Sequence, residues 1–406
     1  MGEYLFLYLS ALFLAAYFVK LICQKIGIPE VTGYVIIGVL LGVSVLRFLT
    51  DPVLEELKSL SSIALGIISF IIGIEFKMPV IRKLGRPIFF IVLLESVGTF
   101  CAVFFSLNAI FPGALNTTLL LGAVAAATAP AATVAVIRQY KAKGPLSSTI
   151  LAVVGIDDAF ALIIYVFAAS FVKASYSGAS FQIWRILGSA GISLGISLVL
   201  GTVCSILYIL ILKKIRNNDW ITLLLVAFIF GMIGLCELLS DSELLTIMTF
   251  GALLLNSSPV LSHKREQIVE NFSPIFLAAF FILGGAHLDI KALGSVGLMG
   301  LAYFGLRTGG KYLGATLGAF LGRAPKVIKK YIGFSLLPQV GVALALALAI
   351  DKDFNVPGYG AKGTQMAYTI INILLFTTIL TELIGPLLTK TAVAKAGETA
   401  ENRETG

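Results

Sequence analysis

The chain has 406 residues, of which 58% are hydrophobic and 13% are charged, and its formal net charge is +8. With a mean hydropathy of +0.97, this composition excludes an ordinary soluble enzyme and is typical of a protein that crosses a membrane many times. The first apolar stretch lacks the basic region and cleavage site of a signal peptide, so we expect it to be a retained helix.

Thirteen apolar stretches are candidates to cross about 30 Å of hydrocarbon at ~1.5 Å per helical residue. They span residues 3–23, 31–49, 59–77, 88–111, 115–139, 147–173, 184–213, 219–239, 243–256, 273–289, 292–322, 327–350 and 366–389. The ninth is short, and most connections have only a few residues. The sequence therefore predicts an all-α polytopic membrane protein with a single transmembrane domain, 1–389, followed by a short cytoplasmic tail, 390–406.

Lys and Arg are distributed unequally over the two sides of this arrangement. One side collects 21 of them and the other 7, while Arg307 and Lys311, inside a segment, complete the 30. The positive-inside rule makes the basic side cytoplasmic, with the N-terminus outside and the C-terminus inside. The net positive charge follows from membrane topology, so we expect membrane lipids around the protein and no nucleic-acid partner.

Cysteine and histidine give little sign of further chemistry. The 4 cysteines lie in apolar stretches without CxxC spacing, so we expect neither a disulfide nor a metal site built on them. His263 and His287 lie near predicted segment ends, and we expect no catalytic role for either. The sequence thus predicts a protein without a cofactor that is not an enzyme.

The odd number of segments suggests two groups of six in opposite orientations, an inverted repeat. The groups cover about 3–173 and 219–389, and the segment 184–213 links them. Transporters with inverted repeats carry interrupted helices at corresponding positions, and the substrate site lies where the interruptions meet. The fifth segment of each group contains a proline in mid-membrane, Pro130 in "AAATAPAATVAV" and Pro338 in "SLLPQVGVALAL".

A proline within a membrane helix frees backbone groups that need other partners at that depth. A simple kink is the alternative for one proline, but the matching positions favour a pair of crossed broken helices. We expect Ala129 and Pro130 to form the first interruption and Pro338 and Gln339 the second.

Two adjacent aspartates, Asp157 and Asp158, lie in the otherwise apolar stretch "TILAVVGIDDAFALIIYVFAAS". Ionised groups at such depth are costly and mark ion pathways or buried pairs. Successive helical residues point about 100° apart, so one aspartate can face a cavity while the other faces a neighbouring helix. We assign Asp157 to Lys311 and Asp158 to a transported cation or proton; a purely structural ion pair is the alternative.

Helical rise places the costly residues in one layer. Asp158, Thr128, Pro338 and Lys311 all lie roughly 16–20 Å from the assumed segment ends, near the bilayer centre. This layer has the pattern of a midplane ion site. For Thr128 the alternative is a hydroxyl that only packs between helices.

A second buried pair is suggested by Arg307 and Glu95, which occupy equivalent segments of the two halves. Three deep acids, Asp157 and Asp158 included, then face two bases, which leaves one negative site for a monovalent cation or a proton. Glu382 is an alternative partner for Arg307, and the count then changes.

The chain resembles the bacterial monovalent cation:proton antiporter-2 family, sodium/proton antiporters in particular. The resemblance rests on "GIDDA", "TAP", "GIPEVTGYVIIGVLLG", "FIIGIEF" and "RTGGKYLGATLGA", and it covers essentially the whole chain. It implies the sodium/proton antiporter fold, a homodimer in the bacterial inner membrane, and elevator-type alternating access that serves pH homeostasis.

On this likeness Asp158 is the principal cation and proton carboxylate, Asp157 exchanges Lys311 for the ion, and Thr128 completes the coordination. Oxygen ligands suit sodium or lithium. Related potassium systems carry a long nucleotide-binding domain and often another residue in place of the first aspartate, and neither is seen here. The Arg307 and Glu95 combination is more typical of electroneutral exchangers, so the stoichiometry stays open.

Three other functions share part of this pattern. A potassium/proton antiporter is the main alternative. A carrier of related fold for an organic anion is disfavoured by the excess of acids at the midplane. An intramembrane aspartyl protease needs two aspartates that face each other from different helices, whereas Asp157 and Asp158 are adjacent.

Overall fold

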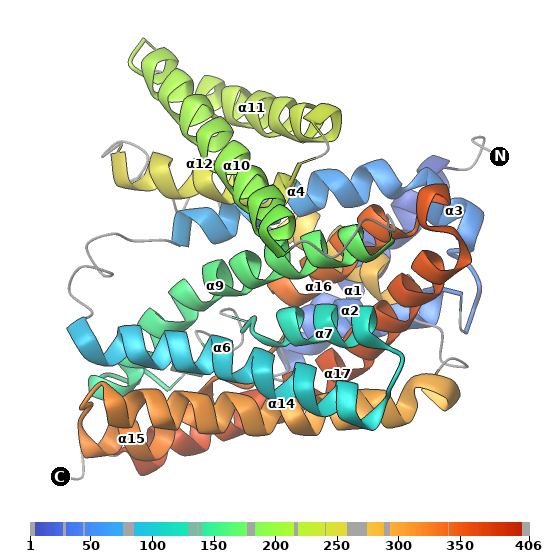
Figure 1. Ribbon diagram of the computed structural model, residues 1–406. Helices are drawn as coiled ribbons and strands as arrows, with labels where there is room; N and C mark the ends of the chain where they lie inside the picture. The colour runs from blue at the N-terminus through green and yellow to red at the C-terminus, as the bar shows by residue number, and fades with distance from the viewer. Residues whose placement is uncertain are drawn as a thin grey trace.

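A computed structural model defines the architecture of the chain (Figure 1). It describes residues 5–26, 30–43, 45–75, 85–129, 133, 136–137, 140–176, 183–214, 218–239, 241–257, 274–287, 293–339 and 341–399. The elements are α1 (Leu5–Ile26), α2 (Glu30–Leu41), α3 (Asp51–Glu56), α4 (Lys58–Glu75), α6 (Gly85–Ile110), α7 (Leu115–Ala125), α9 (Pro145–Tyr176), α10 (Ile183–Leu212), α11 (Asn218–Leu239), α12 (Glu243–Ser257), the helix Pro274–Ala286, α14 (Leu293–Leu321), α15 (Lys326–Tyr331), η3 (Ile332–Ser335), α16 (Gly341–Phe354), η4 (Pro357–Tyr359) and α17 (Gly360–Lys395).

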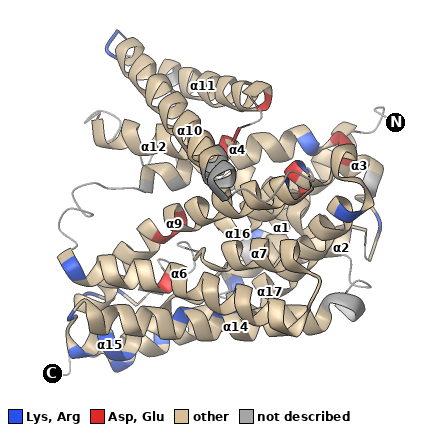
Figure 2. Ribbon diagram, viewed as in Figure 1, with Lys and Arg blue, Asp and Glu red and all other residues tan. Residues whose placement is uncertain are grey.

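Charged residues are sparse along the long helices, as the apolar composition requires. Figure 2 shows Lys and Arg gathered around α15, close to the C-terminus. Arg323, Lys326, Lys329 and Lys330 belong to this stretch. The end of the molecule that carries α15 is therefore strongly basic.

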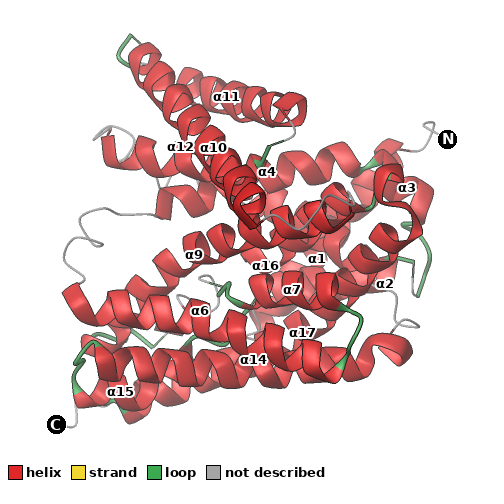
Figure 3. Ribbon diagram, in the orientation of Figure 1, coloured by secondary structure: helices red, strands yellow, loops and turns green. Residues whose placement is uncertain are grey.

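The predicted all-α class is confirmed, since every regular element in the described ranges is a helix (Figure 3). Each predicted segment overlaps at least one helix, and within the described residues 6 helices are long and apolar enough to cross a membrane by length and composition. The number thirteen and the repeat boundaries stay predictions. Two differences are local. The short α3, which begins Asp51-Pro52, precedes α4, and α17 continues to Lys395, beyond the predicted end at 389.

Most of the described helices fall into two packed groups. In one, α4, α10, α11 and α12 pack around an aromatic centre in which the rings of Tyr208 and Phe250 lie 5.7 Å apart and those of Phe228 and Phe250 lie 6.0 Å apart. Figure 1 shows this group on one side of the molecule. The other group contains α6, α7, α9 and α14 to α17.

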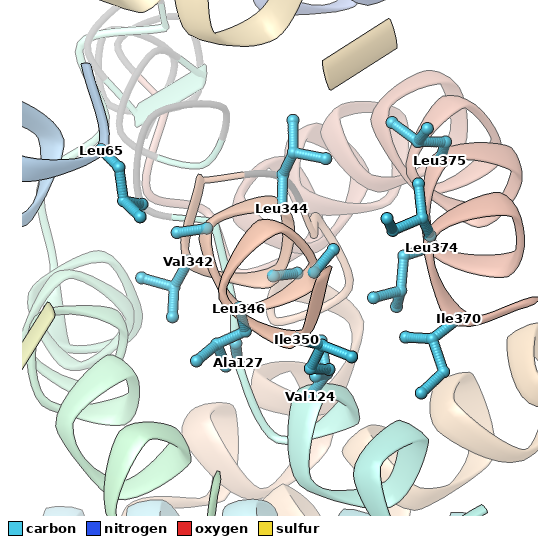
Figure 4. Close-up of a cluster of buried hydrophobic side chains, with 14 of the residues drawn as sticks. Leu65, Val124, Ala127, Val342, Leu344, Leu346, Ile350, Ile370, Leu374 and Leu375 are labelled. Carbon is cyan, nitrogen blue, oxygen red and sulfur yellow. The ribbon is translucent and has the colours of Figure 1, made fainter. Parts of the chain in front are cut away.

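The second group is packed around α16. Its residues Val342, Leu344, Leu346 and Ile350 are almost fully buried against α7, α17 and Leu65 of α4 (Figure 4). Burying a large aliphatic side chain contributes about 1.5–3 kcal/mol in water-soluble cores, whereas in a membrane the same contacts act through close packing. This packing holds the start of α16, and with it the second interruption, in the protein interior.

The pair α6 and α14 approaches closely because α14 carries glycines at the contact. A Cβ added at Gly314 would lie 2.5 Å from the carbonyl oxygen of Leu94, and one added at Gly318 would lie 2.4 Å from that of Phe90. Small residues at four-residue spacing allow membrane helices to approach this closely. The close approach places Lys311 of α14 beside Glu95 of α6.

Candidate functional site

Two non-helical stretches of backbone meet within the second helix group. The helix α7 ends at Ala125 and residues 126–129 are not helical; residues 336–339 likewise separate η3 from α16. The Ala129 N–H donates to the carbonyl oxygen of Pro338 at 2.8 Å, and the Thr133 hydroxyl donates to that of Ser335 at 3.4 Å. The predicted interruptions therefore meet. Pro130 lies outside the described residues.

Arg307 of α14 joins both interruptions. Its guanidinium donates to the carbonyl oxygens of Leu337 at 2.7 Å and Ala127 at 2.8 Å, and its side chain is fully buried. The end of a helix leaves carbonyl groups without intrahelical partners, and a planar guanidinium can serve two of them at once. Arg307 thus fixes the crossing by bonding to its backbone.

Gln339 adds a further connection at the crossing. Its amide donates to the carbonyl oxygen of Val124 at 3.2 Å and to the Tyr303 hydroxyl at 2.8 Å, while the Thr381 hydroxyl donates to the Gln339 carbonyl oxygen at 3.4 Å. The predicted residue Gln339 therefore belongs to the crossing, through contacts that support the backbone.

Lys311 lies one turn from Arg307 on α14 and reaches the first interruption from the same helix. Its ammonium group contacts Asp157 at 3.0 Å and the Thr128 hydroxyl at 2.8 Å, and it also pairs with Glu95 and with the Ala126 carbonyl oxygen. All of these groups are buried. The predicted contact between Asp157 and Lys311 is present.

Glu95 is the point on which the predicted pairing is wrong. The sequence places it beside Arg307, yet its ion-pair partner is Lys311. Arg307 and Lys311 are four residues apart on one helix face, so depth does not distinguish them as partners of Glu95. The close contact between α6 and α14 determines that the partner is Lys311. The side chain of Glu382, the alternative partner, lies outside the described part of the structure.

Asp157 is held by three side chains. Besides Lys311, the Thr128 hydroxyl donates to its Oδ2, and the Ser96 hydroxyl donates to its Oδ1 at 2.7 Å. Ser96 also lies 3.3 Å from the carboxylate of Glu95. Sequence reasoning missed Ser96, because a serine in an apolar helix gives no distinguishing signal.

Asp158 is buried beside this cluster, with 1% of its surface exposed. As a neighbour on α9, it points in a different direction from Asp157. In the described residues, this layer contains three carboxylates (Glu95, Asp157 and Asp158) and two bases (Arg307 and Lys311). Counted as ionised, these described groups hold one more negative charge than positive charge.

His287 does not join the described site. The Nδ1 atom of His287 lies 2.8 Å from the carbonyl oxygen of Leu283, within its own helix. His263 lies outside the described residues. The 4 cysteines are free thiols, away from the crossing.

Membrane transporters bind monovalent cations at buried crossings of two broken helices. The crossing here has hydroxyl, carbonyl and carboxylate oxygens and more acids than bases. The fold and site thus define a secondary ion transporter. The oxygen donors match a hard cation, and a proton can replace the cation on a carboxylate.

Comparison with known proteins specifies the family. The sequence profile described as "Sodium/hydrogen exchanger, transmembrane" matches residues 9–391. The chain is 25% identical over 377 residues to a Na(+)/H(+) antiporter of Enterococcus hirae, covering 91% of this chain and 93% of that protein. It is 23% identical over 381 residues to the Na(+)/H(+)-K(+) antiporter GerN of Bacillus cereus, covering 90% of each.

The fold has a solved counterpart in the sodium proton antiporter MjNhaP1 from Methanocaldococcus jannaschii. The two chains superpose with a TM-score of 0.78 at 20% identity, over 97% of this chain and 99% of the other. The protein belongs to the sodium/hydrogen exchanger family, and it is a membrane transporter, not an enzyme.

Proposed function

We propose that the protein exchanges sodium or lithium for protons across the membrane, and that the two ions compete for Asp158 and Asp157. The observation that carries the proposal is the excess negative charge of the buried cluster. A bare carboxylate in the membrane interior is costly, but it is stabilised by a cation or neutralised by a proton. The site crosses the membrane readily only when a cation or a proton is bound to it. This restriction is sufficient to couple the two ions in exchange.

Asp157 has a partner that a cation could replace. In the proton-bound or resting arrangement, Lys311 holds Asp157 at 3.0 Å. When a cation binds between the two aspartates and Thr128, Lys311 keeps Glu95 as its second carboxylate partner. The lysine therefore need not become an isolated buried charge when it releases Asp157.

Elevator-type alternating access is the proposed movement. The group of α4, α10, α11 and α12 would stay in place while the group that contains the crossing slides past it. Lys352 of α16 connects the two groups, at 3.2 Å from Glu237 of α11 and 3.0 Å from Glu243 of α12. The pair between Lys352 and Glu237 is exposed enough that breaking it costs about 1 kcal/mol or less, whereas the Glu243 carboxylate is buried.

The finer assignments follow the motifs of the sequence. We propose that the protein belongs to the cation:proton antiporter-2 branch and forms a homodimer in a bacterial inner membrane, with its N-terminus outside and its C-terminus in the cytoplasm. The basic stretch around α15 and the C-terminus supports this orientation, because positive residues favour the cytoplasmic side.

Potassium is the second candidate substrate. The name of the Bacillus cereus relative includes both sodium and potassium, and oxygen ligands alone do not rank the two ions. Sodium is favoured by the paired aspartates and by the match to the Enterococcus hirae antiporter.

The experiment is cation-dependent proton movement in proteoliposomes, read with a pH-sensitive dye after additions of sodium, lithium or potassium. We expect sodium and lithium to move protons in the wild-type protein. Asp158→Asn should reduce this movement to the background of protein-free liposomes while the protein stays folded.

The matched control is Glu55→Gln, because Glu55 is an exposed acid paired with Lys58 at 3.3 Å. This variant should exchange like the wild type. Normal exchange by Asp158→Asn would reject Asp158 as the binding residue. Proton movement with potassium but not with sodium or lithium would make potassium the substrate.

A further inference from the structure

The C-terminal end of the chain folds back onto the helix that carries the two aspartates. The helix α17 ends in a Schellman motif, in which the Gly397 N–H donates to the Ala394 carbonyl oxygen at 3.0 Å and the Glu398 N–H donates to that of Val393 at 3.1 Å. Gly397 has a φ of +75°, a left-handed conformation that suits glycine. This turn directs Glu398 towards the first residues of α9.

Glu398 then accepts hydrogen bonds from the first residues of α9. Its Oε1 accepts the Leu146 N–H at 2.7 Å, and its Oε2 accepts the Ser147 N–H and the Ser147 hydroxyl, each at 2.7 Å. Its backbone oxygen accepts the Lys143 N–H at 3.0 Å. The Glu398 residue is 5% exposed, so these hydrogen bonds are shielded from water.

The local sequence leaves this position open for a distant cap. The residue before α9 is Gly144, whose carbonyl oxygen accepts the Ser148 N–H at 3.0 Å, as an N-cap residue does. Gly144 has no side chain to cap the helix, and an added Cβ would lie 2.3 Å from the Glu398 carboxyl carbon. The Glu398 carboxylate thus occupies the place of an N-cap side chain.

Packing extends the contact beyond the carboxylate. Val393, near the end of α17, is 1% exposed and belongs to the same hydrophobic cluster as Leu146 and Ile150 of α9 and Ile328 of α15. The end of α17, the first turn of α9 and the basic α15 form one packed unit, at the end of the molecule that also carries the C-terminus in Figure 1.

We propose that residues 396–399 form a C-terminal strap that caps α9, and that Glu398 is a positioning residue for ion binding. The strap fixes the first turn of α9, three turns before Asp157 and Asp158, and so holds the orientation at which Asp157 meets Thr128 and Lys311. The transport consequence rests on the proposed cation exchange, whereas the cap itself does not.

The test measures full-length variants in two ways, by thermal unfolding in detergent and by sodium titration of proton movement in proteoliposomes. Glu398→Ala removes all three side-chain hydrogen bonds. We expect a lower unfolding temperature and a half-saturating sodium concentration raised about threefold to tenfold, the range that the loss of an N-cap implies, with the maximal rate within about twofold.

A second substitution should reverse the defect. Without the Glu398 side chain, the space at Gly144 opens, and Asp there can cap α9 locally. The double variant Gly144→Asp with Glu398→Ala should regain the wild-type unfolding temperature and half-saturating sodium concentration. Gly144→Asp alone should be impaired, because the new side chain clashes with the Glu398 carboxylate. Thr391→Ala is the control, because among the described residues this exposed hydroxyl donates within α17, to the Leu387 carbonyl oxygen at 2.8 Å.

The two measurements separate the possible failures. An unchanged sodium half-saturation in Glu398→Ala, or a defect that the double variant does not reverse, overturns the positioning role. If the wild-type protein moves no protons with sodium, the proposed exchange fails instead. The unfolding temperatures of the same variants still test whether Glu398 caps α9. Should Glu398→Ala not fold, Glu398→Gln, which keeps one acceptor oxygen, is compared with the wild type in the same two measurements, and an unchanged sodium half-saturation then overturns the positioning role.

Discussion

The close contact between α6 and α14 gives a prediction that tests how the structure brings the charged cluster together. Gly314→Ala would place a Cβ 2.5 Å from the Leu94 carbonyl oxygen and 2.8 Å from the Glu95 Cα. An ordinary carbon-to-oxygen contact needs about 3.3–3.6 Å, so the two helices must separate by roughly 1 Å. Glu95 lies at the contact itself, so the separation would also loosen its pair with Lys311.

The magnitude follows from two opposing effects. Overpacking a tight contact costs about 1–3 kcal/mol, while alanine in place of glycine favours a helix by about 0.5–1 kcal/mol. Gly309→Ala offers a matched control on α14, because an added Cβ there has no neighbour within 4 Å in the described structure. Both variants share the helix-propensity gain, so their difference in stability, about 1–3 kcal/mol, isolates the contact.

The assay is equilibrium unfolding of both purified variants in mixed detergent micelles, followed by sodium-dependent proton movement in proteoliposomes. We expect Gly314→Ala to be less stable and less active than Gly309→Ala. If Gly314→Ala is as stable and active as Gly309→Ala, the close approach of α6 and α14 does not position the cluster, and the reasoning is refuted.

Two further predictions concern the buried bases. Lys311→Ala should destabilise the protein by about 3–5 kcal/mol, because it leaves Glu95 and Asp157 without their lysine, and adding Glu95→Gln should recover stability. It should also change the charge moved per transport cycle more than the apparent sodium affinity. Equilibrium unfolding measures the loss of stability, and transport at different membrane potentials measures the charge moved. Arg307→Lys should cost about 1–3 kcal/mol, because a point-charge ammonium does not replace the planar fork that bonds Ala127 and Leu337; equal unfolding free energies for this variant and the wild type would contradict the bridging role.

Several features of the site could be predicted from the sequence because they follow from the cost of polar groups in a membrane. The two mid-membrane prolines predict the interruptions, and the crossing is confirmed by the hydrogen bond from Ala129 to Pro338. Asp157 and Lys311 lie at one depth, and a buried acid and a buried base at one depth need each other. These arguments use only position along a helix.

Other features depend on which side of a helix faces which neighbour. Ser96 contacts Asp157, and Glu95 pairs with Lys311 instead of Arg307, because the glycines of α14 set how α6 lies against it. A count of residues gives depth but not the relative rotation of two packed helices. The partner of Glu95 could therefore not be predicted.

The sequence by itself determines the membrane class, the helical segments and the layer in which charges meet, because hydrocarbon makes each unsatisfied polar group costly wherever it lies in the chain. Only the tertiary structure decides the contacts between segments distant in sequence, such as the carboxylate of Glu398 on the first turn of α9. Those contacts arise from the packing of whole helices, which no local pattern of residues encodes.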